Sequence, residues 1–113
     1  MKTSLSVLLL TGIAAVIPAA LGAATAQENW DAQCKKCHAA DGSGSGTMGK
    51  KLKLKDYTSA EVQAGMKDED IIKVIKEGVK DEATGKMTMP AYAEKLSAED
   101  INALLAHIRA MKK

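Results

Sequence analysis

This sequence is short of aromatic residues. Its 113 residues include one tryptophan, two tyrosines and no phenylalanine. Aromatic rings normally supply much of the buried area of a small core, so we expect another large apolar group to fill the centre. Basic residues are also too few, and too rarely interleaved with aromatics, to indicate a nucleic-acid-binding protein.

Cysteine is scarce as well. The two cysteines, Cys34 and Cys37, exclude a framework of several disulfides. Three interpretations of the pair stay open as alternatives to the one developed below. A structural zinc site needs four ligands, and beyond His38 only the distant His107 is left. A thioredoxin-like motif would follow a strand, and no strand pattern precedes Cys34. A plain disulfide would leave His38 without a role.

The segment Cys34-Lys35-Lys36-Cys37-His38 has the Cys-x-x-Cys-His spacing of c-type haem attachment. Two thiols three residues apart on a helical turn face the same side, where they can add to the two vinyl groups on one edge of the macrocycle. His38 can then turn under the iron as its proximal ligand. The motif predicts one covalently bound haem c.

Five residues compete for the opposite side of the iron: Met48, Met66, Met87, Met89 and His107. Met89 is the predicted ligand, because the proline that follows it has a fixed φ and holds the preceding residue extended, which stiffens the loop. A thioether also raises the reduction potential relative to a second imidazole. Met87, two residues away, and bis-histidine ligation by His107 are the alternatives.

Residues 1–26 have the pattern of an export signal. The segment combines a positive start, an apolar run, a proline break and a small-x-small cleavage site, at Lys2, Leu5–Ile17, Pro18 and Ala24–Ala26. We therefore predict a cleavable signal peptide over 1–26 and a periplasmic domain over 27–113, with no membrane insertion after cleavage. An uncleaved anchor is the alternative, since the apolar stretch approaches the roughly 20 residues of a membrane span.

Within 27–113 the pattern predicts an all-α domain with no paired strands. We expect helices over 28–37, from a Thr58 or Ser59 cap through 63, over 68–77, and after Ser97, where Ser97 and Asp100 resemble a capping box. The glycine-rich stretch 39–49 is expected to be a loop. The stretch 50–55 is expected to be an extended loop that places Leu52 and Leu54 under the haem.

Charge is unevenly distributed. Residues 35–55 hold six lysines and one acid, a local charge of +5, whereas residues 56–100 hold eleven acids and six lysines, a local charge of −5. The molecule should therefore carry a dipole, and the lysines near the haem edge could steer redox partners with acidic docking faces. Ordinary solvated lysines are the alternative interpretation.

Together these features resemble the small monohaem class I cytochromes c of bacteria. The phrase beginning Cys37-His38-Ala39 resembles the family's Cys-His-Gly-x-Asp-Gly, and Met89-Pro90-Ala91-Tyr92 resembles its Met-Pro-Ala-Phe/Tyr. The resemblance covers 27–113 and implies a class I cytochrome c fold, with three to five short helices around one haem. It implies thioethers at Cys34 and Cys37, and axial ligation by His38 and Met89. It also implies a monomeric electron carrier that serves redox proteins and is not an enzyme.

The sequence departs from the family pattern at two positions, and two other functions remain as alternatives to electron transfer by a carrier. Ala39 replaces the usual glycine, which should be tolerated if its φ is negative. His107 replaces an aromatic that packs on the first helix in the family, and Trp30 is expected to fill that space.

A haem peroxidase or gas-binding protein would need an open distal position. A fixed electron-entry subunit of a larger complex is not distinguished by sequence.

Overall fold

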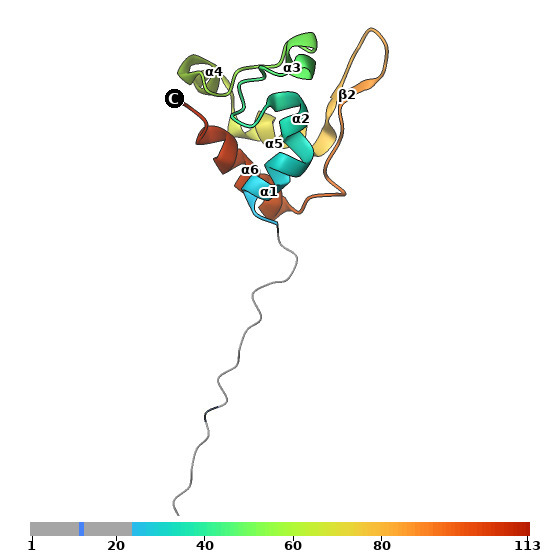
Figure 1. Cartoon of the computed structure of the whole chain (residues 1–113). Helices are drawn as coiled ribbons and strands as arrows, with labels where there is room; N and C mark the ends of the chain where they lie inside the picture. The colour runs from blue at the N-terminus through green and yellow to red at the C-terminus, as the bar shows by residue number, and fades with distance from the viewer. Residues whose placement is uncertain (1–11, 13–23) are drawn as a thin grey trace, which may run out of the picture.

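The computed structural model describes residue 12 and residues 24–113, which form a mostly helical domain (Figure 1). The predicted signal peptide, 1–26, lies outside the described residues except for residues 12 and 24–26. The helices are α1 (Ala26–Asn29), η1 (Trp30–Cys34), α2 (Lys35–His38), α3 (Thr47–Lys51), α4 (Ala60–Gly65), α5 (Asp68–Glu77) and α6 (Ala98–Arg109). In the described part of the chain, none of them has the length and apolarity to cross a membrane. The expected helical class is confirmed.

The first three helices follow one another without a break and form a single helical segment over 26–38. Thr25 caps it, because the Thr25 hydroxyl accepts from the Glu28 backbone N–H while the Glu28 carboxylate accepts from the Thr25 N–H. The segment begins two residues before the predicted start. Its middle, η1, is a π-turn in which the Lys35 N–H donates to the Trp30 carbonyl. Such turns are rare and occur frequently at functional sites, and this one ends at Cys34.

The prediction that no segment pairs as strands is wrong. Strand β1 (Val79–Lys80) pairs antiparallel with β2 (Met87–Met89), and Val79 lies opposite Met89. Gly78, with a φ of 74°, turns the chain out of α5, and Gly85, with a φ of 72°, helps to close the hairpin. The strands are too short to show a pattern of period two, so their residues carry no strand signal.

Helix α3 also corrects an expectation, because Thr47–Lys51 falls within segments expected to be loop. Gly49, which belongs to the glycine-rich stretch, is buried in α3. A Cβ added at Gly49 would lie 2.7 Å from the Cys37 carbonyl oxygen and would also collide with the Gly44 carbonyl. The missing side chain therefore lets α3 pack directly against α2.

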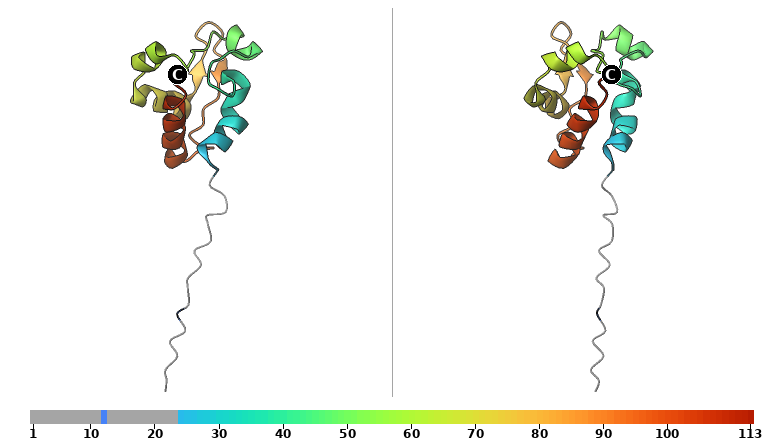
Figure 2. Two further views of the ribbon diagram at one scale, coloured as in Figure 1. Left: turned by 60° about the vertical axis from the view of Figure 1, so that its left-hand side comes forward. Right: turned by 90° about the vertical axis from the view of Figure 1, so that its left-hand side faces the viewer.

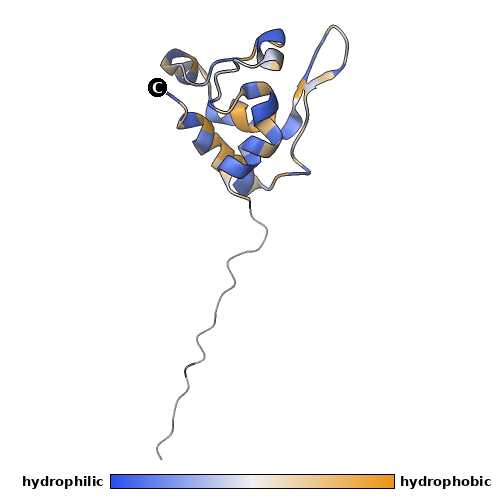
Figure 3. Cartoon of the chain, in the orientation of Figure 1, coloured by the Kyte–Doolittle hydropathy of each residue, from blue (hydrophilic) through white to orange (hydrophobic). Residues whose placement is uncertain are grey.

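The core lies where α6 meets the first helical segment and α5 (Figure 2). Its buried members are Trp30, Ile75, Tyr92, Leu96, Ile101, Leu104 and Ile108. The predicted capping box at Ser97 and Asp100 starts α6, and Ile101, Leu104 and Ile108 of this helix are buried in the core. Figure 3 shows hydrophobic stretches of α6 and the neighbouring helices toward the centre of the domain. The core is thin, and it surrounds a cavity.

Candidate haem site

The cavity has a volume of about 660 Å³ and a mostly apolar lining. Residues from the first helical segment, the stretch 51–57, α5, the hairpin and α6 surround it. Leu52 and Leu54, expected to lie under the cofactor, are among the lining residues. The volume is within the range of about 300–1,000 Å³ that is typical of cofactor and ligand sites.

Cys34, Cys37 and His38 all line this cavity. Both cysteines are free and partly buried. Burial, together with the nearby Cys37, raises the pKa of the Cys34 thiol to about 11. Cys34 is therefore an uncharged thiol at neutral pH, and the two sulfurs approach the cavity from the same helical segment.

The His38 imidazole lies between other rings and has no polar anchor among the described residues. Its pKa is lowered by burial, so the ring is neutral at pH 7, the form that ligates metals. Tyr57 stacks on it with ring centroids 5.3 Å apart and planes at 21°, and Trp30 lies at 5.7 Å. The His38 Nδ1 is buried and has no hydrogen-bond partner in the described part of the chain. A neutral imidazole, two thiols and an apolar cavity fit a c-type haem.

Two of the five candidates for the opposite ligand line the cavity, namely Met89 in β2 and Met66 just after α4. The other three do not: Met87 is 48% exposed, Met48 is 38% exposed, and His107 packs against Trp30. Of the five candidates, the structure therefore places Met89 and Met66 at the cavity. The sequence favours Met87 over Met66, because distance along the chain does not reveal that α4 ends at the cavity wall.

The loop after Met89 is anchored by Tyr92, which is buried. The Tyr92 hydroxyl donates to the Gln33 carbonyl at 3.0 Å, and its backbone N–H donates to the Ile75 carbonyl at 3.0 Å. These bonds tie the loop to the first helical segment and to α5. In the sequence, Tyr92 stands out only as part of the Met-Pro-Ala-Tyr phrase, which carries no sign of this anchoring role.

Ala39 does not meet the condition under which it was expected to be tolerated, a negative φ, since its φ is 68° and its ψ is 165°. The chain reverses direction directly after His38, and four hydrogen bonds fix the reversal. The Ala39 N–H donates to the Lys35 carbonyl, and the Gly44 N–H donates to the His38 carbonyl. The Ala39 carbonyl accepts from the Gly42 N–H at 3.3 Å and from the Trp30 indole N–H at 3.0 Å. The alanine therefore occupies a glycine-like position.

His107 and Trp30 meet as the sequence led us to expect. Their ring centroids lie 5.6 Å apart with planes at 50°, and Trp30 is 1% exposed. Trp30 thus fills the crossing between the first helical segment and α6. His107 Nε2 is buried without a hydrogen-bond partner in the described residues.

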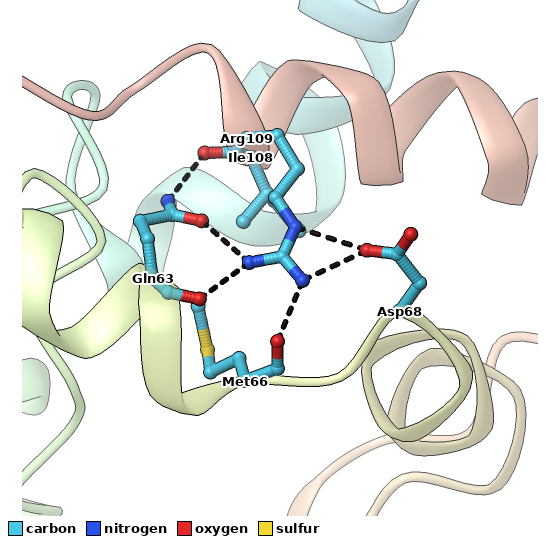
Figure 4. Close-up of polar contacts among 5 residues, drawn as sticks. All are labelled: Gln63, Met66, Asp68, Ile108 and Arg109. Atoms are coloured by element: carbon cyan, nitrogen blue, oxygen red, sulfur yellow. Dashed lines mark hydrogen bonds and ion pairs between the residues drawn. The ribbon is translucent and has the colours of Figure 1, made fainter.

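A polar network joins α6 to α4 and to the start of α5 (Figure 4). The Arg109 guanidinium donates to the carbonyls of Gln63 and Met66, each at 2.7 Å, and forms an ion pair with Asp68 at 2.8 Å. The buried Gln63 amide donates to the carbonyls of Tyr57 and Ile108, each at 2.8 Å. Tyr57 and Met66 line the cavity, so this network, which sequence reasoning missed, connects α6 to the site.

Short helices around an apolar cavity that holds a Cys-x-x-Cys-His segment define a c-type cytochrome domain. Residues 22–108 match the family model described as cytochrome c oxidase, cbb3-type, subunit III, and the chain belongs to this family. The domain is also similar to the solved structure of the KustC0563 c-type cytochrome, with 34% identity and a TM-score of 0.67. That match covers 80% of this chain and 100% of the other. A search of curated proteins found no match. Cys34 and Cys37 are the pair for covalent haem.

Proposed function

We propose that this protein carries single electrons between redox proteins in the periplasm, with His38 and Met89 as the axial ligands of its haem iron. The observation that supports this proposal is that His38 in α2 and Met89 in β2 line the same cavity as both thiols. The proposal includes removal of residues 1–26 as a signal peptide and a monomeric domain over 27–113. When bound, the haem supplies an iron that accepts and releases one electron.

The residues of this chain hold and tune that group. Cys34 and Cys37 fix one edge from a single helical segment, and the neutral His38 offers a nitrogen lone pair. The Met89 thioether favours the reduced state of an iron centre. The anchored loop around Tyr92 and the apolar lining exclude water and keep the ligands in place, which reduces rearrangement during electron transfer.

The near-infrared band of methionine-sulfur ligation in the oxidised protein tests the ligand assignment. We expect Met89→Ala to abolish the band, because the thioether is lost. Met66→Ala should keep it, and Met87→Ala is the matched control, since Met87 is 48% exposed and does not line the cavity. Loss of the band only in Met66→Ala would make Met66 the ligand. Absence of the band from the unsubstituted protein would point to His107 or to an open-site enzyme.

A second candidate function is that of a fixed electron-entry subunit, which the family description as an oxidase subunit favours. The state of the N-terminus separates the two functions. A diffusible carrier should begin at Gln27 and appear in the soluble periplasmic fraction, whereas a fixed subunit should fractionate with a membrane oxidase. Intact mass shows where the mature chain begins, and fractionation shows where the protein is found. Cleavage before Gln27 would also remove Thr25, the cap of α1.

A further inference from the structure

Trp30 makes a polar contact that core packing does not require. Its side chain is 1% exposed, and its indole N–H donates to the Ala39 carbonyl at 3.0 Å. A buried tryptophan usually finds a hydrogen-bond partner, but this partner belongs to the residue directly after His38. The Trp30 ring also lies 5.7 Å from the His38 ring, tilted by 43°. Trp30 therefore has two links to His38: a hydrogen bond to the residue that follows it and a ring–ring contact with its imidazole.

His38 lacks the usual means of orientation. A metal-ligating histidine almost always donates its second ring N–H to a carbonyl, carboxylate or water, which fixes the plane of the ring. Within the described residues, no carbonyl or carboxylate accepts a hydrogen bond from the buried Nδ1 of His38. The protein groups that bear on the plane of this imidazole are therefore the packed rings of Trp30 and Tyr57 and the backbone that follows His38.

That backbone is strained. With a φ of 68° and a ψ of 165°, Ala39 lies in a region that is populated almost only by glycine and that persists where the surroundings hold it. Three of its four restraining hydrogen bonds join backbone groups, including the bond from the Gly42 N–H to the Ala39 carbonyl at 3.3 Å. The fourth, from the Trp30 indole N–H, is shorter at 3.0 Å. It comes from a side chain, so it is the one that a side-chain change can remove.

Trp30 is itself held rigidly. His107 of α6 lies 5.6 Å from the indole ring on a tilted plane, and Trp30 belongs to the same buried cluster as Ile101 and Leu104. The indole N–H is thus fixed in space by α6. A restraint on Ala39 would be weak if its donor moved freely, and packing against α6 restricts the movement of this donor.

We propose that Trp30 is a positioning residue for His38: its indole N–H, together with the Gly42 N–H, holds the Ala39 peptide in the strained conformation, and its ring helps to fix the plane of the imidazole. The inference rests on the proposed role of His38 as an axial ligand. It assigns to Trp30 the orienting role that a hydrogen bond to the ligating histidine has in other metal sites.

The test removes the N–H donor and keeps the ring. Trp30 is the only tryptophan of the chain, and 3-benzothienyl-alanine at position 30 puts sulfur in place of the N–H at nearly the same size. Trp30→Phe is the second variant. The readouts are the haem methyl shifts of the oxidised protein, which depend on the plane of the axial imidazole, and the midpoint potential. We expect both to shift in both variants.

Two comparisons separate positioning from stability. Ser97→Ala removes the cap of α6 and none of the hydrogen bonds at Ala39, so it should lower stability while leaving the methyl shifts unchanged. In an Ala39→Gly background, glycine adopts the conformation without help, so the analogue should shift the methyl resonances less than it does beside Ala39.

Unchanged methyl shifts in the analogue, with a stability loss like that of Ser97→Ala, would show that Trp30 is only structural. Equal shifts with alanine and with glycine after His38 would overturn the route through the Ala39 peptide. If the unsubstituted protein lacks the spectrum of a histidine-ligated low-spin haem, the proposed function fails as well. That outcome is distinct, because it appears before any substitution is made.

Discussion

At the scale of single residues, Ala39 offers the clearest stability prediction. Its backbone conformation costs an alanine about 1–3 kcal/mol, whereas glycine adopts it freely but loses about 0.4–1 kcal/mol through its more flexible unfolded chain. Ala39→Gly should therefore raise the free energy of unfolding of the haem-loaded protein by about 1 kcal/mol, measured by denaturant titration.

The neighbouring alanine provides the control. Ala40 is exposed and is not among the residues with positive φ, so Ala40→Gly should leave stability unchanged or reduce it by up to about 1 kcal/mol. A gain of similar size in both variants would show that the effect does not come from the backbone conformation of Ala39.

At the scale of the elements, Arg109 joins α6 to the junction between α4 and α5. Arg109→Ala removes the charged donor from the carbonyls of Gln63 and Met66, so we expect a loss of about 2 kcal/mol in the free energy of unfolding. Asp68→Asn removes only the ion pair, in which the Asp68 side chain is 59% exposed, and should cost less than about 1 kcal/mol. Equal losses in denaturant titration would mean that the ion pair, and not the carbonyl contacts, joins the elements.

The same scale shows what the sequence could and could not predict. Helices α5 and α6 were predictable, because an acidic first turn at α5, a capping box at α6 and apolar residues at helical spacing are local signals. Helix α3 and the hairpin were not, since α3 depends on the contact of Gly49 with α2 and the hairpin has only two residue pairs. The Cys-x-x-Cys-His segment was also predictable, because it is a short contiguous pattern. Met66, Tyr57 and Arg109 come to the site through tertiary packing, which the sequence does not reveal.

At the scale of the whole molecule, a bound haem would explain both the shortage of aromatic residues and the cavity. The buried hydrophobic core of the described residues contains two aromatic rings, Trp30 and Tyr92, and it borders a cavity of about 660 Å³. A bound haem would complete this core, since it would contact the apolar faces of α5 and α6 that line the cavity. Cofactor binding and folding are therefore expected to be coupled.

Charge provides the prediction at this scale. Lys51, Lys53 and Lys55 are exposed and line the cavity, so an anionic oxidant such as ferricyanide should react faster at low ionic strength and slow down as salt is added. The Debye length falls from about 30 Å at 0.01 M to about 10 Å at 0.1 M. A cationic reagent such as hexaammineruthenium should show the opposite trend, and stopped-flow measurements of both rates across this range test the prediction.

Replacing Lys51, Lys53 and Lys55 with glutamine should remove most of the salt dependence, because the local field at the cavity is lost. The matched control replaces three lysines that are exposed and do not line the cavity, namely Lys73, Lys76 and Lys112. This control variant changes the net charge by the same amount and should keep most of the salt dependence of the rate. If both triple variants lose it equally, the net charge controls the encounter, and the lysines at the cavity are ordinary solvated side chains. If only the first variant loses it, electrons enter and leave through the lysine-lined side of the cavity, and that side is where an acidic partner would dock.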